Sequence, residues 1–381
     1  MRVIPFGKPI IGDEEKGAVQ GVLSGTVLVH GPKALDFERE FALLTKAPFA
    51  VAVSSCTAAM HLFYFNLGLK KGDEVIVPAQ THTSTAHAVE VMGAKPVFVD
   101  ADEQTGNIDI DQIEDSITER TRAISVVHFL GMPVDMKRVT AISHKHGIPV
   151  LEDCALATGS KLDGIHAGLF GECGCFSFYP VKHITTGEGG MLITKNEMIA
   201  RQISSKKAFG IDRHHGERAL PGVYDVETLG LNYRMSEIQA AIGIEQLKRV
   251  EGFLRIRKEN YDELAKGLSE LDEIDLLDSS HDSFESSYYC LSIILKDKIA
   301  GKRASIVSYL KENGIGTSVY YPKPVPHMQY YSAKYGYDQE SFPRAARISY
   351  SSIALPVGPH LNIDDMQYMV DGVKKALREV M

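Results

Sequence analysis

Cysteine is scarce in this chain, which has five among its 381 residues. The odd number and the irregular spacing fit a reducing compartment better than a disulfide framework, so we expect a cytoplasmic protein. Cys173 and Cys175 lie close together, but no second Cys or His pair follows at the spacing of a zinc site. We therefore interpret both as packed core residues and expect no metal site.

The chain also has no excess of positive charge and no long apolar run. Its formal net charge of −8 argues against a nucleic-acid groove and against binding to an anionic membrane surface. No stretch approaches the ~20 apolar residues of a membrane span, and the first five residues do not begin a signal-peptide apolar region. Because the overall charge is negative, local groups must hold any phosphorylated ligand.

Strands and helices alternate over the first half of the chain, whose apolar share of 44% is that of a globular protein. The alternation predicts β-α-β units, a mainly parallel sheet with helices on both faces, and a ligand site beyond the carboxyl ends of the strands. We expect strands over residues 49–53, 74–78, 95–99, 123–127, 149–152, 175–179 and 191–194. Helices are expected over residues 14–23, 35–45, 58–67, 83–92, 109–117, 135–146 and 197–208.

The order changes after Thr194. Residues 210–228 are polar, and their cationic cluster at 213–215 fits a mobile substrate loop or a simply solvated one. Two helices, over residues 237–250 and on to about 271, then lead to a C-terminal part. There we expect strands at 288–295 and 317–321 and helices at 304–312 and 363–377. We divide the chain into a large domain, 1–250, and a smaller α+β domain, 251–381.

A lysine stands in a glycine-rich bend between two apolar strands. Lys182 follows the apolar segment 175–179, and Thr185, Thr186 and the run Gly-Glu-Gly-Gly at 187–190 precede the next strand. Lysine is mostly a surface residue unless it is paired or chemically used. A crowded lysine loses basicity and becomes a nucleophile, as a Schiff-base lysine must. Taken alone, the position fits a turn lysine that reaches water equally well.

Four further polar features accompany this lysine. Asp153 follows a strand that reads as buried, and Ser177 lies on the strand that leads to the lysine. His82 falls at another strand end, and residues 54–58 precede an apolar helix. Ser and Thr at such a helix start are either simple N-caps or part of an anion site, because free N–H groups and the helix dipole favour a phosphate there.

Pyridoxal phosphate (PLP) needs this set of groups. Its phosphate requires N–H and hydroxyl donors, and its pyridine nitrogen stays protonated beside a carboxylate. Its aldehyde requires an amine, which then moves the proton during the reaction. A ring or a flat apolar group should cover its face.

The sequence resembles the DegT/StrS-type sugar aminotransferases, which are fold-type I PLP enzymes. The resemblance covers nearly the whole chain and is carried by the segments SSCTAAMHL, GDEVIVPAQTHTSTAHAVEVMGAKPVFVD, VLEDCALATGSKLDG, FSFYPVKHITTGEGGM and LGLNYRMSEIQAAIGIEQLKR. It implies an α/β fold with a large domain, built on a seven-stranded, mainly parallel sheet, and a smaller C-terminal domain. It also implies a homodimer with shared active sites.

The resemblance assigns roles residue by residue. Lys182 matches the lysine that binds the cofactor covalently, and Asp153 matches the partner of its pyridine nitrogen. The remaining matches are the phosphate donors Thr57, Ala58 and Ser177, the ring-covering His82, Asn232 reaching the phosphate of the other subunit, and the substrate-facing His327, Tyr321 and His30.

One position departs from the family. Three residues after the matched aspartate, the family usually places His, Gln or Glu against the cofactor, and this chain has Leu156. A leucine can pack against the ring but cannot hydrogen-bond the phenolic oxygen of the cofactor. The residue is either a cofactor contact of a different kind or a core residue.

The resemblance implies transfer of an amino group from L-glutamate, or glutamine, to a keto group of a nucleotide-linked deoxysugar. The product would serve polysaccharide or glycoconjugate biosynthesis, lipopolysaccharide included. Relatives with histidine at the lysine position act as dehydratases, and this chain keeps the lysine. A dehydratase that uses the same cofactor, or a PLP-binding regulator without turnover, are the alternatives.

Overall fold

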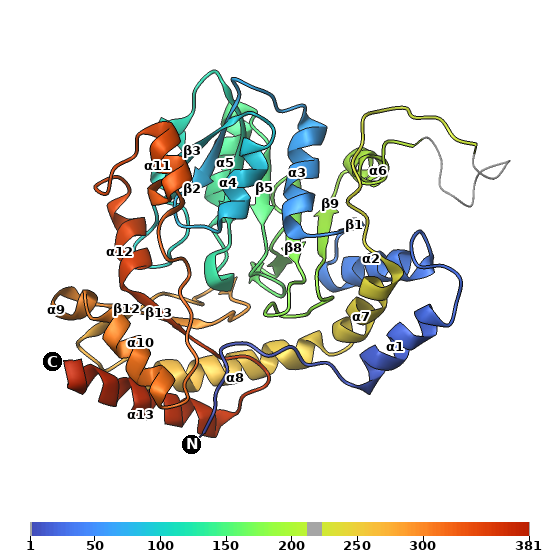
Figure 1. Cartoon of the computed structure of the whole chain (residues 1–381). Helices are drawn as coiled ribbons and strands as arrows, with labels where there is room; N and C mark the ends of the chain where they lie inside the picture. Colours follow the sequence, from blue (N-terminus) through green and yellow to red (C-terminus); the bar gives the residue numbers. More distant parts are fainter. Residues whose placement is uncertain (1, 212–222, 381) are drawn as a thin grey trace.

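A seven-stranded sheet forms the centre of the molecule (Figure 1). In the computed structural model, which describes residues 2–211 and 223–380, the strand order is β1-β9-β8-β5-β4-β2-β3. The strands are β1 (Phe49–Val53), β2 (Glu74–Pro78), β3 (Lys95–Val99), β4 (Thr121–Val127), β5 (Val150–Asp153), β8 (Cys173–Ser177) and β9 (Gly190–Thr194). β9 is antiparallel to both of its neighbours, and the other neighbouring pairs are parallel. The prediction of a mainly parallel sheet is therefore confirmed.

The sheet separates two layers of helices, because alternate strand residues point to opposite faces. In β2, Val75 and Val77 join the core on one face and Ile76 joins the core on the other. The first face is covered by α3 (Cys56–Leu67), α4 (Thr83–Glu90) and α6 (Glu197–Lys206). The second is covered by α2 (Pro32–Thr45), α5 (Met136–His146) and α7 (Glu237–Leu247), with α1 (Asp13–Leu23) packed against α7.

The long helix α8 (Val250–Leu268) leads into a second core. An antiparallel sheet there has the order β10 (Ile274–Leu276), β12 (Leu291–Leu295), β13 (Ser352–Leu355). The helices α10 (Arg303–Glu312) and α13 (Ile363–Val380) pack on it, and the short α9 (Asp297–Ala300) follows β12. A third, small sheet joins β11 (Phe284–Glu285) to the hairpin of β6 (Lys161–Leu162) and β7 (Ile165–His166), and so links the two parts of the chain.

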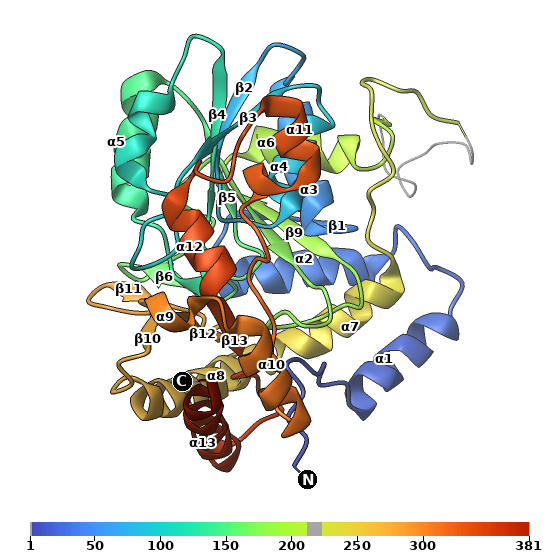
Figure 2. The same cartoon turned by 60° about the vertical axis from the view of Figure 1, so that its left-hand side comes forward.

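Part of the C-terminal third of the chain returns to the large sheet. The turn η5 (Val325–His327) and the helices α11 (Gln329–Tyr335) and α12 (Pro343–Ser351) place apolar residues in the same core as α3 and α4. Figures 1 and 2 both show α11 close to β2 and β3, α12 between α11 and the sheet of β12 and β13, and α13 at the bottom of the molecule. The domain division at residue 250 stays a prediction, and residues 325–351 cross it.

Two local predictions are wrong. Residues 109–117 form two short 3₁₀ turns, η1 (Ile110–Gln112) and η2 (Glu114–Ser116), in which the backbone bonds span three residues and the side chain of Asp109 caps the first turn. Residues 317–321 are not a strand, since Ser318 pairs with Ala354 only in an isolated bridge. The cationic cluster at 213–215 lies outside the described residues. Among the helices that are described, none combines the length and apolar content needed to cross a bilayer.

Candidate active site

The carboxyl edge of the sheet gathers most of the polar residues that the sequence singles out. Asp153 is the last residue of β5, and its carbonyl accepts the N–H of His128, which directly follows β4 (3.2 Å). β1 and β2 run in the same direction as β5, so α3 and α4, which follow them, begin at this same edge. Ligand sites in such sheets lie at this edge.

The carboxylate of Asp153 is buried and held by several donors. Its Oδ2 accepts the hydroxyl of Thr85 at 2.8 Å, and its Oδ1 accepts the N–H of Ala155 at 3.0 Å. The Sγ of Cys56 lies 3.8 Å from the same Oδ1. Burial, followed by the charge of Asp153, raises the pKa of the Cys56 thiol, so this group stays protonated, and its single proton has two acceptors, Oδ1 of Asp153 and the nearer carbonyl of Cys175 at 3.3 Å. These bonds fix the orientation of the carboxylate.

A second hydroxyl extends this arrangement. Oγ1 of Thr81 lies 2.8 Å from Oγ1 of Thr85, and because Thr85 gives its own proton to Asp153, Thr81 is the donor in this pair. Both threonines are buried. Neither threonine, nor Cys56, was predicted to surround this carboxylate. Only their proximity to a strand end hinted at such a role.

Lys182 stands in a tightly bonded turn between β8 and β9. The N–H of Lys182 bonds the carbonyl of Tyr179 at 2.9 Å, and the hydroxyl of Thr185 bonds the carbonyl of Phe178 at 2.9 Å. Gly187 has a φ of +81°, which favours glycine and closes the bend. The turn therefore holds the lysine backbone at one place beside the sheet.

The lysine side chain is half-buried in apolar and aromatic surroundings. Its Nζ lies 5.4 Å from the centre of the Tyr289 ring. Burial lowers the pKa of Lys182, although Cys56, Asp153 and Cys290 act in the opposite direction. A lowered pKa enlarges the fraction of neutral amine, which is the nucleophilic form.

The N-terminus of α3 forms the third component. The side chain of Ser55 caps the helix by accepting the N–H of Ala58 at 3.0 Å, and the side chain of Thr57 is exposed. Gly190, at the start of β9, lies so close that a Cβ there would be 2.3 Å from the Ser55 carbonyl carbon. The glycine-rich run therefore allows the lysine turn and the helix N-terminus to meet. Ser177 ends β8 half-buried at this same place.

His82 and Tyr321 lie together at the start of α4. Their ring centres are 5.6 Å apart in an edge-to-face arrangement. Nδ1 of His82 caps α4 by accepting the N–H of Ser84 at 3.1 Å. Burial, followed by the charge of Lys182, lowers the pKa of His82 and keeps its ring neutral. The structure thus brings a predicted cofactor residue and a predicted substrate residue into contact.

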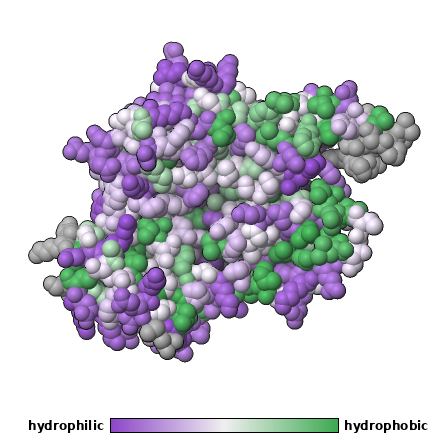
Figure 3. Space-filling view, viewed as in Figure 1, coloured by the Kyte–Doolittle hydropathy of each residue, from purple (hydrophilic) through white to green (hydrophobic). Residues whose placement is uncertain are grey.

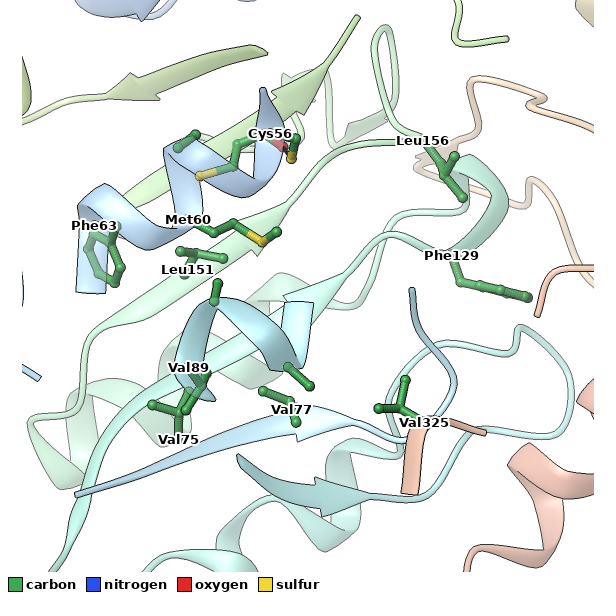
Figure 4. Packing of buried hydrophobic residues seen from close by; sticks show 14 of the residues in the cluster. Cys56, Met60, Phe63, Val75, Val77, Val89, Phe129, Leu151, Leu156 and Val325 are labelled. Atoms are coloured by element: carbon green, nitrogen blue, oxygen red, sulfur yellow. Dashed lines mark hydrogen bonds between the residues drawn. The ribbon is translucent and has the colours of Figure 1, made fainter. Parts of the chain in front are cut away.

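Leu156 is a buried residue of the large core. It is 1% exposed and belongs to the cluster that also contains Phe129, and Figure 4 shows the two at the same end of that cluster. Its carbonyl accepts the hydroxyl of Ser287 at 2.7 Å. The packing gives Leu156 a structural place, and its contact with the cofactor stays a prediction.

The structure gives three other predicted site residues partners outside the group around Asp153 and Lys182. His327 is 2% exposed, and its ring nitrogens lie 3.2 Å from the Tyr350 hydroxyl and 2.7 Å from the Ser341 carbonyl, so binding a substrate would break one of these bonds. His30 lies in the exposed loop before α2, 3.0 Å from Nη1 of Arg234. Asn232 is exposed and pairs with Ala208 through its backbone. Their assigned roles stay predictions.

A buried His128–Glu152–Cys154 cluster lies on the opposite face of β5. Nδ1 of His128 accepts the N–H of Val134 at 3.0 Å, so its Nε2 donates to Glu152 at 3.0 Å. The Glu152 carboxylate also accepts three backbone N–H groups, from Gly168, Phe170 and Gly171. With these bonds in place, the cluster ties two loops to the strand that carries Asp153.

The sequence profile described as the DegT/DnrJ/EryC1/StrS aminotransferase family matches residues 9–374. The chain belongs to this family. The chain is similar to the GDP-perosamine synthase of Escherichia coli O157:H7, which is 34% identical over 98% of this chain and 99% of its own length. The spore coat polysaccharide biosynthesis protein SpsC of Bacillus subtilis is 36% identical over 99% of this chain and 97% of its own.

A solved structure of the same family has the same fold. The PLP form of Spr1654 from Streptococcus pneumoniae superposes with a TM-score of 0.93 and 29% sequence identity, covering 100% of both chains. Its PMP form superposes with a TM-score of 0.94. The chain is therefore a fold-type I, PLP-dependent sugar aminotransferase of the DegT family.

The residues of this chain fit that cofactor. A half-buried lysine of lowered pKa, a buried carboxylate with fixed orientation and a capped helix N-terminus lie around one sheet edge. Gly190 allows β9 to approach the N-terminus of α3 closely, which a residue with a side chain would prevent. These groups supply the amine, the anionic partner and the N–H donors that PLP requires.

Proposed function

We propose that this aminotransferase moves an amino group from L-glutamate, or glutamine, to a keto group of a nucleotide-linked deoxysugar. The placement of Lys182 carries the proposal, since a half-buried lysine of lowered pKa stands beside the sheet edge that ends in Asp153. The name of the related GDP-perosamine synthase supports a nucleotide-linked sugar. We place the product in the biosynthesis of a polysaccharide or glycoconjugate such as lipopolysaccharide.

Each site residue has a defined part in this proposal. The bound cofactor supplies the electron sink for the reaction. Lys182 would hold the cofactor and then, once released, move the proton through its Nζ. Asp153, oriented by Thr85 and Ala155, would keep the ring nitrogen protonated. Thr57, Ala58 and Ser177 would bind the phosphate, and His82 and Leu156 would cover the ring.

We further propose a homodimer in which Asn232 completes the site of the other subunit. Exposed apolar side chains support an interface on the side of the molecule where α2 and α6 lie, as Figure 3 shows. They are Val27, Leu28, Val29, Leu35, Phe209, Val226 and Leu229. Apolar patches exposed on one side of a molecule are typical of interaction sites. His30 lies in the same loop as Val27–Val29 and would contact the substrate from this side.

We place the enzyme in the cytoplasm. Its five cysteines are free and buried thiols, which suits a reducing compartment.

One experiment tests the reaction. The PLP-loaded protein is incubated with nitrogen-labelled glutamate or glutamine and a panel of keto-sugar nucleotides, and products are identified by mass. We expect the label to appear in an amino sugar, and the Lys182→Ala and Lys182→Arg variants to form none. Loss of oxygen from the sugar without uptake of label would instead identify a dehydratase. Unchanged spectra of the cofactor in both variants would remove Lys182 from its assigned role.

A further inference from the structure

A small cavity beside Lys182 is bounded by residues from five parts of the chain. It measures about 20 Å³ and is lined by the N-terminal residues 6–10, the turn that carries Lys182, residues of α7 and α8, Tyr289, and the segment 358–360. A volume of this size holds one small ion or a water-sized group.

The described lining of this cavity is basic and contains no carboxylate. Its five basic side chains are Lys8, Lys182, His183, Arg257 and His360. Glu15 lies close by on α1, but its carboxylate already accepts the side chains of Gln246 and Arg249 and the N–H of Gly12. Burial lowers the pKa of His183 and His360 and keeps both rings neutral, so the positive charge of the lining comes from its two lysines and Arg257, and no acidic side chain of the lining neutralises it.

Arg257 is the most informative of these residues. It is 5% exposed, and its Nη1 donates to the carbonyl of Tyr289 at 2.9 Å. Its buried Nε has no partner within the part of the chain that the structure describes, and Arg257 forms no ion pair there. A buried cation is costly unless it is paired.

A second buried group at the cavity also has an unused atom. His183 is 3% exposed and its Nε2 lies 3.0 Å from the Ser287 carbonyl, whereas its Nδ1 has no partner among the described residues. Tyr289 connects the cavity to the candidate active site. Its ring centre lies 5.4 Å from Nζ of Lys182 and 6.0 Å from Cζ of Arg257.

We propose that this cavity is an anion subsite, in which the guanidinium of Arg257 binds a small anion of halide or carboxylate size. The anion would pair with the buried guanidinium and lie close to the lysine. Two sources share this chemistry, a free inorganic anion and the carboxylate of the amino donor. The assignment to the donor's carboxylate rests on the proposed function, whereas the assignment to a free inorganic anion does not.

Thermal unfolding of the full-length protein tests the subsite without turnover. Chloride or formate, compared with the larger gluconate at constant ionic strength, should raise the Tm by roughly 1–3 °C with saturation. Arg257→Gln should abolish this specific rise. Arg255→Gln on the same helix is the matched control, because Arg255 is exposed, and it should keep the rise. An equal response to all anions, or a normal response of Arg257→Gln, would overturn the proposal.

A second set of measurements covers the case in which Arg257→Gln does not fold. Arg257→Lys keeps the charge and should respond with weaker apparent affinity. Crystals of the wild-type protein in bromide should show an anomalous peak within hydrogen-bond reach of Arg257, and absence of this peak at saturating bromide would refute the subsite.

Inhibition kinetics identify the source of the anion. Competition of formate with the amino donor, and not with the sugar, would assign the subsite to the donor's carboxylate. Lack of competition, together with a bromide peak, would assign it to a resident inorganic ion. If the protein transfers no amino group at all, the unfolding and bromide measurements still decide the subsite on their own.

Discussion

The hydroxyl of Thr85 donates a 2.8 Å hydrogen bond to Oδ2 of Asp153. The two residues are 68 positions apart, and they meet because α4 begins at the sheet edge where β5 ends. The carboxylate of Asp153 must face one fixed direction to pair with a ring nitrogen, and this hydrogen bond restricts its rotation.

Thr85→Val should therefore weaken cofactor binding. Hydrogen bonds to charged groups contribute about 1.5–3 kcal/mol, so we expect a loss of roughly 10–100-fold in affinity, measured as the Kd of PLP. Thr140→Val on α5 is a matched control, because its hydroxyl bonds the carbonyl of Met136 in a helix outside the site. Equal PLP affinity in both variants would show that Thr85 does not position the carboxylate.

The shared site predicts complementation between two inactive variants. Asn232→Ala should impair the neighbour's site, and Lys182→Ala should inactivate its own. After subunit exchange, a mixture should recover part of the activity, because one site of each mixed dimer contains both native residues. Exchange is verified with a mass tag on one variant, and mixtures that exchange fully but stay inactive would contradict the shared site.

Leu156→Ala separates packing from cofactor contact. Emptying a buried leucine position costs about 2–5 kcal/mol of unfolding free energy, and we expect this loss in the cofactor-free protein. If the side chain also covers the ring, PLP should bind about tenfold less tightly, since ~1.4 kcal/mol of lost contact is tenfold.

The control for this experiment is Leu69→Ala, which empties a buried position of the same core. It should destabilise the protein and leave the PLP affinity unchanged. An unchanged affinity in Leu156→Ala as well would limit Leu156 to the core. Leu156→His is informative in addition, because it would introduce a polar contact and change the pH dependence of the cofactor's absorbance.

His166 makes the fold sensitive to acid. Burial lowers the pKa of His166 to about 4, from an ordinary 6.5, and its Nε2 accepts the N–H of Gly159. Between these two values the unfolded chain binds a proton and the folded chain does not, so stability falls as the pH drops from 6.5 towards 4. The full decrease in the free energy of unfolding amounts to roughly 3 kcal/mol.

Replacing this ring should flatten the acid dependence. In urea unfolding between pH 7 and pH 4.5, His166→Gln should show a shallower fall of the unfolding free energy than the wild type. His144→Gln, at an exposed position on α5, should leave the wild-type slope unchanged. A wild-type slope in His166→Gln would assign the acid sensitivity to other groups.

The sequence predicted the parts of the site that are consecutive in the chain. Lys182 and its glycine run stand in one segment, and strand periodicity placed Asp153 at a strand end. Thr85 could not be selected in this way, because nothing in its local sequence distinguishes it from Thr83. Only the pairing of β2, β4 and β5 brings its hydroxyl to Asp153.

Wrong predictions have a similar origin. Residues 109–117 have apolar spacing that suits a helix, but their backbone bonds span three residues, as in 3₁₀ turns. The division of the chain at residue 250 stays a prediction, and α11 and α12, which follow that point, place apolar residues in the core of the large sheet. The apolar pattern of a sequence indicates which face of a helix or strand is buried, but it does not indicate in which of two cores that face packs.

The returning segment 325–351 limits how the two parts of the molecule can move. The N–H of Val325 bonds the carbonyl of Ala79, and Gln80 bonds both the carbonyl of Tyr320 and the hydroxyl of Ser349. Near the other end of the chain, Ile4 pairs with Ile315. The chain thus connects the two cores at several separate places and not through a single hinge. These connections oppose a hinge motion that would separate the two cores, so we expect access to Lys182 to depend on movements of nearby loops and side chains.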